Sequence, residues 1–353
     1  MKDLDNPELL KQLDRGNMLA PLHEMSDSCQ RAWQMALDFR LPPDYAQVNK
    51  VVVAGMGGSA IGSDLVRSLT IAEARLPVLV LRDYDLPGYI DGQTLVIASS
   101  YSGMTEETLS FFTAALRTPA RKLVLTTGGK LKEMAEQNKV PVFQIDYQAQ
   151  PRAALAFSCL PLLAFFQRLA FIGDKSASVA ETVAVLRQLS TRIKEDIPLS
   201  HNPAKQLAEK LHRHLPVIYG AGILAEVAHR WKTQLNENSK TWAFYDVLPE
   251  LNHNSVVGYQ FPPELAKQAV VVMLRSAGLH ERIKLRYEVT AEMLDRAKVH
   301  YEIVDAEGTS PLSQMMSLVL FGDYVSYYLA ILCKIDPSTV AIIDYLKKKL
   351  AER

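Results

Sequence analysis

Short apolar runs alternate with longer amphipathic segments along the first half of the chain. Five apolar runs have the length and composition of buried strands: 50–54, 78–81, 94–99, 122–126 and 140–144. The segments between and around them carry apolar residues at helical spacing, which predicts helices at 28–39, 60–72, 105–117 and 131–137. Strands that alternate with helices predict a mostly parallel β-sheet covered by helices on both faces.

The second half repeats the same alternation after a long amphipathic helix predicted at 176–196. Its strand candidates are 215–219, 241–245, 269–274 and 300–304, and its helix candidates are 201–214, a segment from residue 224, 282–298, 312–334 and 337–352. We therefore predict an α/β protein with two three-layer domains. The predicted boundaries are a helical segment at 1–45, a domain at 46–172, a helical linker at 173–200 and a domain at 201–353.

Composition narrows the classes of function. The chain has 353 residues, 48% of them hydrophobic, and its 39 basic residues equal its 39 acidic ones. A net charge of zero argues against a broad nucleic-acid-binding surface. The three cysteines (Cys29, Cys159 and Cys333) are scattered, which indicates neither a disulfide framework nor a zinc site. The most apolar stretch, 153–166, contains Pro161 and is too short for a membrane span, so we expect a core helix and a cytoplasmic protein.

The first apolar run ends in a glycine-rich turn, Gly55-Met-Gly57-Gly58-Ser59, which leads into a helix. A helix start offers unpaired N–H groups and a partial positive charge, and glycines let a ligand approach the backbone. The turn therefore suits a phosphate or another anion. It matches neither the dinucleotide fingerprint nor the Walker A loop, and a tight turn without a ligand is the alternative.

A second polar loop follows the run at 94–99. It reads Ser100-Tyr-Ser102-Gly-Met-Thr105, with Thr105 in position to be the N-cap of the next helix and Thr108 three residues on. The hydroxyl groups of this loop suit helix capping, phosphate binding or both. Two such loops after two strands of one parallel sheet would meet outside its carboxyl edge, where α/β folds bind ligands.

The second half carries a cluster of groups that can move protons. Asn236-Glu237-Asn-Ser-Lys240 stands at the end of a predicted helix, and Pro249-Glu250-Leu-Asn-His253-Asn254 forms a polar loop. A carboxylate with an imidazole suits proton transfer near neutral pH, although a lone Glu or His is more often solvated. The spacing of these residues does not match a metal site.

These four motifs together resemble the bifunctional phosphoglucose/phosphomannose isomerases of the sugar-isomerase (SIS) domain family, from about residue 28 to 350. The resemblance implies two SIS domains and a homodimer whose active site is shared between subunits. It also implies a hexose 6-phosphate substrate and no metal or cofactor. The chain departs from the family pattern at Met104, where Asn is expected, and at Ser63, where Gly is common.

The resemblance also implies a role for each motif. Arg152 would stabilise the enediolate, Glu237 would move the proton between C1 and C2, and His253 would help to open the sugar ring from the neighbouring subunit. Lys347 is the expected lysine of the C-terminal helix, with Lys348 and Lys349 beside it. The residues that would face or hold the substrate phosphate are Gly57, Gly58, Ser59, Ser100, Ser102 and Thr105.

Two of these residues have simpler interpretations. Arg152 could lie on the surface, and the lysines could be a solvated helix end. Glu250 is a second carboxylate in the polar loop, for which we expect a hydrogen-bonding role. The predicted activity is the interconversion of glucose 6-phosphate, and of mannose 6-phosphate, with fructose 6-phosphate through an enediolate. The alternative is a SIS protein that senses a sugar phosphate without catalysis.

Overall fold

The chain folds into two compact units, each with its own β-sheet. The computed structural model describes residues 3–352, apart from the side chain of residue 351. The first-sheet unit comprises residues 24–184 and 309–313, and the second-sheet unit comprises residues up to 23, 185–308 and from 314 on. Both sheets are parallel throughout, which confirms the predicted fold class.

The first sheet has the strand order β2-β1-β3-β4-β5. Its strands are β1 (Lys50–Ala54), β2 (Val78–Leu81), β3 (Thr94–Ser99), β4 (Arg121–Thr126) and β5 (Val142–Gln144). The central strands β1 and β3 lie side by side, with Val51 opposite Leu95, and all residues of β3 are buried. Continuous apolar runs are expected where a parallel sheet is covered on both faces.

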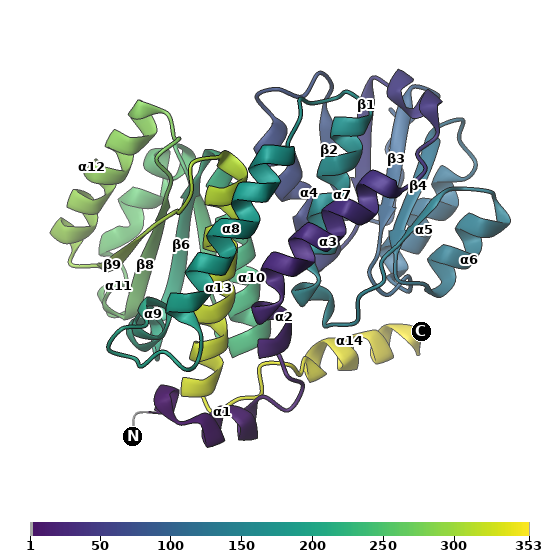
Figure 1. Ribbon diagram of the computed structural model, residues 1–353. Helices are drawn as coiled ribbons and strands as arrows, with labels where there is room; N and C mark the ends of the chain where they lie inside the picture. The colour runs from purple at the N-terminus through teal and green to yellow at the C-terminus, as the bar shows by residue number, and fades with distance from the viewer. Residues whose placement is uncertain (1–2, 353) are drawn as a thin grey trace. The chain divides into compact units, whose positions relative to one another are not determined.

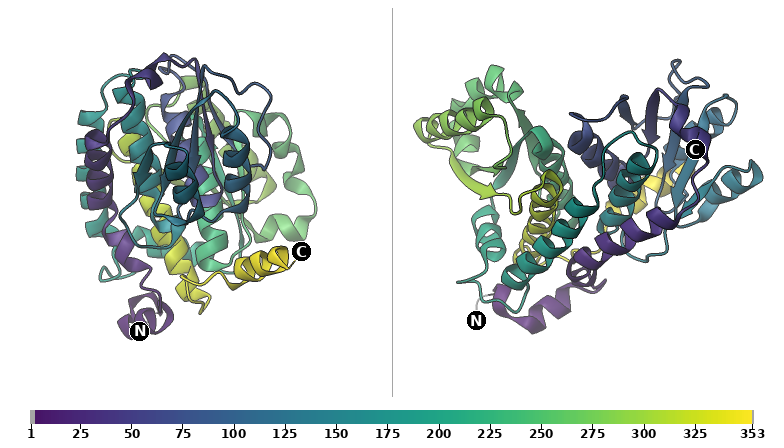
Figure 2. Two further views of the ribbon diagram at one scale, coloured as in Figure 1. Left: turned by 90° about the vertical axis from the view of Figure 1, so that its right-hand side faces the viewer. Right: turned by 45° about the horizontal axis from the view of Figure 1, so that its top comes forward.

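Helices cover both faces of this sheet (Figures 1 and 2). Helices α3, α4 and α7 lie on one face, and α5 and α6 lie on the other. Their bounds are α3 (Met25–Asp38), α4 (Gly57–Thr70), α5 (Glu106–Ala115), α6 (Gly129–Gln137) and α7 (Leu155–Arg168), with 3-10 turns η2 (Pro43–Gln47) and η3 (Pro151–Ala153). The apolar stretch with Pro161 is α7, a buried helix as predicted.

The second sheet has the strand order β7-β6-β8-β9. Its strands are β6 (Leu215–Ala221), β7 (Phe244–Leu248), β8 (Ala269–Arg275) and β9 (His300–Asp305). Helix α12 lies on one face, and α10 and α13 lie on the other (Figure 1). Tyr287 and Leu294 of α12 pack against Tyr219 and Val271 of the sheet.

The remaining elements of the chain are mostly helical. Helices α8 and α13 contain residues of both units. The bounds are α1 (Pro7–Leu13), α2 (Leu19–His23), α8 (Ser176–Ile193), α9 (Pro203–Leu211), α10 (Ala225–Ser239), α11 (Pro263–Gln268), α12 (Glu281–Ala297), α13 (Pro311–Leu332) and α14 (Ala341–Ala351), with 3-10 turns η1 (Asp3–Asp5), η4 (Gly222–Leu224), η5 (Glu250–His253) and η6 (Ser255–Gln260).

Helix α13 is long and apolar enough to cross a membrane by length and composition, but 94% of its most apolar window is buried inside the protein. Such burial is typical of a core helix. An ion pair connects α13 to α10. Nη2 of Arg230 on α10 lies 3.1 Å from Oδ1 of Asp323 on α13. Both side chains are almost fully buried, so the pair links α10 to α13 inside the second-sheet unit.

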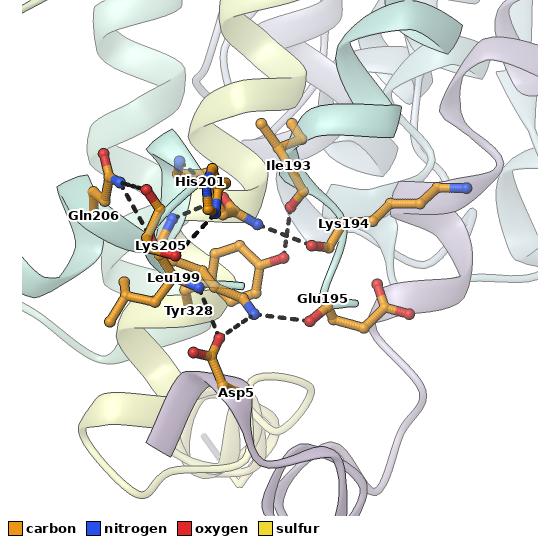
Figure 3. A network of polar contacts seen from close by, with 12 residues as sticks. Asp5, Ile193, Lys194, Glu195, Leu199, His201, Lys205, Gln206 and Tyr328 are labelled. Atoms are coloured by element: carbon orange, nitrogen blue, oxygen red, sulfur yellow. Dashed lines mark hydrogen bonds and ion pairs between the residues drawn. The ribbon is translucent and has the colours of Figure 1, made fainter. Parts of the chain in front are cut away.

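A second buried charge ties the N-terminal segment to the second-sheet unit (Figure 3). Nζ of Lys205 donates to Oδ1 of Asp5 at 2.9 Å and to the Glu195 carbonyl at 2.8 Å. The same Asp5 oxygen accepts the Leu199 N–H at 2.9 Å. Beside this network, the Tyr328 hydroxyl donates to the Ile193 carbonyl. The ammonium group thus exchanges water for fixed oxygen acceptors.

Candidate functional site

The glycine-rich turn connects β1 to α4, as predicted, and it requires its glycines. Gly57 has φ of +49°, a conformation that side chains other than glycine rarely adopt. A Cβ on Gly55 would lie 2.7 Å from the Ser99 carbonyl oxygen. Helix α4 begins at Gly57, three residues before the predicted start, and no side chain caps it. The Ser59 and Ala60 N–H groups donate to the Met56 carbonyl at 3.0 and 3.3 Å, so the N–H groups of Gly57 and Gly58 are the ones that can meet a ligand or water.

Ser59 joins this turn to the second polar loop. Its Oγ accepts the Tyr101 N–H at 3.0 Å, and its carbonyl accepts the Ser99 hydroxyl at 3.3 Å. Strands β1 and β3 are neighbours, so the two loops meet at the carboxyl edge of the first sheet, as the sequence predicts.

The hydroxyl groups of the second loop do not cap the helix that follows. Thr105 is the N-cap residue of α5, as predicted, but its side chain makes no capping bond. Its Oγ1 lies 2.9 Å from Oγ of Ser100 instead, and Oγ of Ser102 accepts the Met104 N–H. By contrast, the N-cap of α9, Asn202, accepts two N–H groups of its helix. The N–H groups in the first turn of α5, at the positive end of the helix, thus donate no hydrogen bond to the N-cap side chain.

A pair of glycines supports the second loop from behind. Gly103 has φ of +65°, and a Cβ there would overlap the Gly128 carbonyl oxygen. A Cβ on Gly129 would lie 2.5 Å from the Ser102 carbonyl oxygen. The Thr127 hydroxyl donates to the Tyr101 carbonyl at 2.7 Å. The support that Gly128 and Gly129 give to the hydroxyl loop was not identified from the sequence.

Arg152 is buried beside the start of α4, so the surface interpretation is wrong. Its side chain is 3% exposed, and its Cα would lie 3.2 Å from a Cβ on Gly58. Tyr101 holds the preceding segment, because its hydroxyl donates to the Tyr147 carbonyl at 2.6 Å and accepts the Ala149 N–H at 2.9 Å. One residue of the hydroxyl loop therefore fixes the segment that carries the arginine. This role of Tyr101 was also missed.

The two departures from the family pattern leave the loop intact. Met104 is 60% exposed, and its sulfur accepts the Lys130 N–H at 3.4 Å. Ser63 is buried and donates to the Ser59 carbonyl at 3.5 Å.

The corresponding loop of the second sheet is closed by its own side chains. It connects β8 to α12, whose N-cap His280 accepts the Arg282 N–H at 3.1 Å. The Ser276 hydroxyl donates to Gln314, and Arg275 forms a two-point ion pair with Asp305 at 2.8 and 2.9 Å. Because these donors already have acceptors, the anion site is favoured at the first sheet.

In the second-sheet unit, Glu237 stands in the last turn of α10, and the residues around it hold that turn. Nδ2 of Asn236 donates to the Thr241 carbonyl, and Nδ2 of Asn238 donates to Ser326 on α13, both at 2.9 Å. Nζ of Lys240, at the left-handed C-cap, donates to the Asp336 carbonyl at 2.8 Å. Glu237 itself is half-buried. These bonds fix the backbone of the turn that carries Glu237, whose side chain water only partly surrounds.

The polar loop after β7 is also tied down, except at its imidazole. The Asn252 amide donates to Thr290 at 2.9 Å and accepts from Arg286 at 3.0 Å, both on α12. Oε1 of Glu250 accepts from Asn254 at 2.9 Å, the hydrogen-bonding role expected of it. His253 is exposed.

The remaining predicted residue, Lys347, lies on α14 and is exposed. Of its neighbours, Lys349 forms an ion pair with Glu352 at 2.6 Å. The structure therefore gathers the predicted phosphate residues and Arg152 in the first-sheet unit, whereas Glu237, His253 and Lys347 belong to the second-sheet unit.

Comparison with known proteins identifies relatives over the whole chain. Residues 200–350 match the family described as bacterial phospho-glucose isomerase C-terminal SIS domain. A protein of Caldicellulosiruptor bescii named bifunctional phosphoglucose/phosphomannose isomerase is 42% identical over 336 residues, 95% of this chain and 99% of that protein. One of the same name from Aquifex aeolicus is 34% identical over 87% of this chain and 92% of its own.

The fold also has relatives among solved structures. A protein of Thermus thermophilus described as glucose-6-phosphate isomerase like has a TM-score of 0.66 and 18% identity, covering 97% of this chain and 100% of its own. At this level of identity the likeness concerns the fold.

Proposed function

Because the chain belongs to the family of bifunctional phosphoglucose/phosphomannose isomerases, we propose that it interconverts glucose 6-phosphate and mannose 6-phosphate with fructose 6-phosphate. The observation that carries this proposal is the pair of helices, α4 and α5, that start side by side without a side-chain cap among three serines and a threonine. A phosphate ester fits such a site because it accepts many hydrogen bonds and favours a positive helix end.

The substrate phosphate would bind the turn Gly57–Ser59 and the hydroxyls of Ser100, Ser102 and Thr105. The phosphate does not react, so this binding serves to position the carbon atoms that do. Ser59 and Tyr101 couple the two loops, which supports the proposal that they act on one phosphate group.

Glu237 is the proposed base. It would remove the proton from C2 of the open-chain aldose, which leaves an enediolate with the former C1 carbonyl oxygen as an oxyanion. The hydroxyl proton then moves from O2 to O1, and return of the first proton from Glu237 to C1 forms the C2 carbonyl of the ketose. In the reverse direction, delivery to either face of C2 gives the glucose or the mannose ester. The bonds of its neighbours hold the end of α10, which supports the proposal because a base acts best from a fixed backbone position.

Arg152 would stabilise the oxyanion of the enediolate. A buried guanidinium is always charged and is worth more to an oxyanion than one in water. His253, supplied by the neighbouring subunit, and Lys347 would share ring opening, in which a proton leaves the anomeric hydroxyl and another reaches the ring oxygen. This sequence of steps needs neither a metal ion nor a redox cofactor. We propose a homodimer as the active form.

The domain limits 46–172 and 201–353 stay a prediction.

The decisive experiment replaces Glu237 by Gln and follows fructose 6-phosphate by NMR in D₂O. The wild type should form both aldose esters and incorporate deuterium at C1 and C2. We expect E237Q to lose about 10²- to 10⁴-fold in kcat, the range typical of general acid–base catalysis. Binding of 6-phosphogluconate, measured by calorimetry, should be unchanged because the phosphate residues are intact.

The matched control is Glu250→Gln, since an amide oxygen can still accept the hydrogen bond from Asn254. We expect E250Q to keep kcat within a few-fold of the wild type. Normal turnover in E237Q would refute the assignment of the base. Binding of the ester by the wild type with no aldose product would favour the alternative of a sensing protein.

A further inference from the structure

The strongest unexplained polar group near the hydroxyl loop is Thr108. It is the third residue of α5 and 2% exposed. Among the residues that the structure describes, its Oγ1 is buried without a hydrogen-bond partner. Leaving a hydroxyl in this state costs free energy, so an unpaired one in a native fold calls for an explanation.

Two other buried threonines in helices of this chain satisfy their hydroxyls locally. Thr70 donates to the carbonyl of Val66 at 2.8 Å, and Thr182 donates to that of Ser178 at 2.7 Å, each four residues back. For Thr108 the residue four back is Met104, which lies before the helix starts. The Thr108 hydroxyl therefore lacks the usual acceptor, the carbonyl four residues back. The carbonyl of a loop residue such as Met104 does not point along the helix axis.

The place of Thr108 on α5 indicates another partner. It shares the buried face of the helix with Phe111, Phe112 and Ala115, and side chains on a helix lean toward its N-terminus. Thr105 lies three residues before it, on the same side. In a capping box, the side chain at the third helical position accepts the N–H of the N-cap residue. Here that box is open, because the Thr105 hydroxyl is bonded to Ser100.

We propose that Thr108 is a positioning residue of the phosphate loop and that its hydroxyl accepts the Thr105 N–H when the substrate phosphate binds. In the structure, the hydroxyls of Ser100 and Thr105 hydrogen-bond to each other at 2.9 Å. A phosphate takes both of them, and Thr108 then fixes the N-cap so that the first N–H groups of α5 point at the phosphate oxygens. This inference rests on the proposed function, since it requires that the loop binds a phosphate.

The test compares Thr108→Val, which keeps the shape and removes the hydroxyl, with Thr108→Ser, which keeps it. Thr113→Val is the matched control, because Thr113 is exposed on the same helix and donates to Leu109. The assays are kcat and KM for fructose 6-phosphate, the inhibition constant of inorganic phosphate, and the thermal unfolding midpoint. We expect T108V to raise KM and the inhibition constant roughly tenfold, the effect of one hydrogen bond, with kcat within about twofold. T108S should restore both constants, and T113V should leave them unchanged.

A structural role alone predicts the opposite pattern. Removal of a hydroxyl that never finds a partner should raise the unfolding midpoint and leave KM and the inhibition constant unchanged, and this result would overturn the proposal. A fall in kcat with an unchanged inhibition constant would overturn it as well. The wild-type measurement separates the two proposals: wild-type turnover supports the isomerase assignment, whatever the effect of T108V on phosphate binding.

Discussion

Replacement of Gly58 by alanine should damage catalysis more than stability. A Cβ at this position would lie 2.9 Å from the Pro151 carbonyl oxygen and 3.2 Å from the Arg152 Cα, closer than backbone atoms tolerate without moving. The neighbours are backbone and cannot rotate away, so the segment that carries Arg152 must shift. Overpacking of this kind costs about 1–3 kcal/mol.

A suitable control is Gly62→Ala, one turn further along α4. A Cβ there would overlap Oγ of Ser158 and lie 2.8 Å from the Ser158 carbonyl carbon, in the contact between α4 and α7. It would press on α7 and on the hydrogen bond from Ser158 to the Gly58 carbonyl, whereas its three nearest atoms do not include the backbone of Arg152. It should destabilise the protein by a similar amount, again about 1–3 kcal/mol. For a unit of this size, each kcal/mol lowers the unfolding midpoint by about 2–4 °C.

The two variants should separate in the activity assay. A displacement of about 1 Å in a positioned catalytic group costs on the order of 10²-fold in rate. We therefore expect G58A to lose about 10²-fold in kcat/KM for fructose 6-phosphate at a temperature where both variants are folded, and G62A to lose less than about tenfold. Equal activity of G58A and G62A would refute the placement of Arg152 in the reaction.

Two further predictions concern stability. Asp323→Asn should lower the free energy of unfolding by about 3–5 kcal/mol, because it removes the charge of the carboxylate that forms a buried ion pair with Arg230; urea unfolding that shows a change below about 1 kcal/mol would contradict this. Glu181→Gln should lower stability in a pH-dependent way. Hydrogen bonds from Ser310 and Thr309 hold the pKa of the Glu181 carboxyl at about 2 instead of 4.5, so its contribution is present above pH 4.5 and is lost as the pH falls toward 2. The difference in urea midpoint between the two proteins should therefore shrink over that range; a constant difference would contradict the assignment.

Much of the fold could be predicted because its strands are locally encoded. The runs at 50–54, 78–81 and 94–99 are strands with the predicted bounds, since each is a short apolar segment between polar turns. The prediction was wrong by three residues for β7, which spans Phe244–Leu248 instead of 241–245. Lys240 closes α10 in a left-handed conformation, and pairing starts only where Phe244 lies opposite Val217. The start of β7 is therefore set by its register with β6. The local sequence of β7 does not specify that register.

The sequence predicted a helical segment at 1–45 but not the bounds of the short helices α1 and α2 within it, and α14 starts at Ala341, four residues after the predicted start. Helices this short have little periodicity to detect. The N-terminal segment is held in place by contacts with residues far away in the sequence. One example is the hydrogen bond from Lys205 to Asp5.

For the candidate site, the sequence by itself determined the chemical groups and their order. A glycine turn, a hydroxyl loop, an arginine and a carboxylate are visible as motifs because each depends on residue type. Only the tertiary structure decided how these groups are used. Thr105 could equally have capped its own helix; the approach of Ser100 gave its hydroxyl another partner and left the helix start open. Arg152 could equally have been solvated, and the tight contact of its segment with Gly58 buried it. The hydrogen-bond partner of Thr105 and the burial of Arg152 depend on contacts between segments that are far apart in the sequence. These contacts exist only in the folded chain.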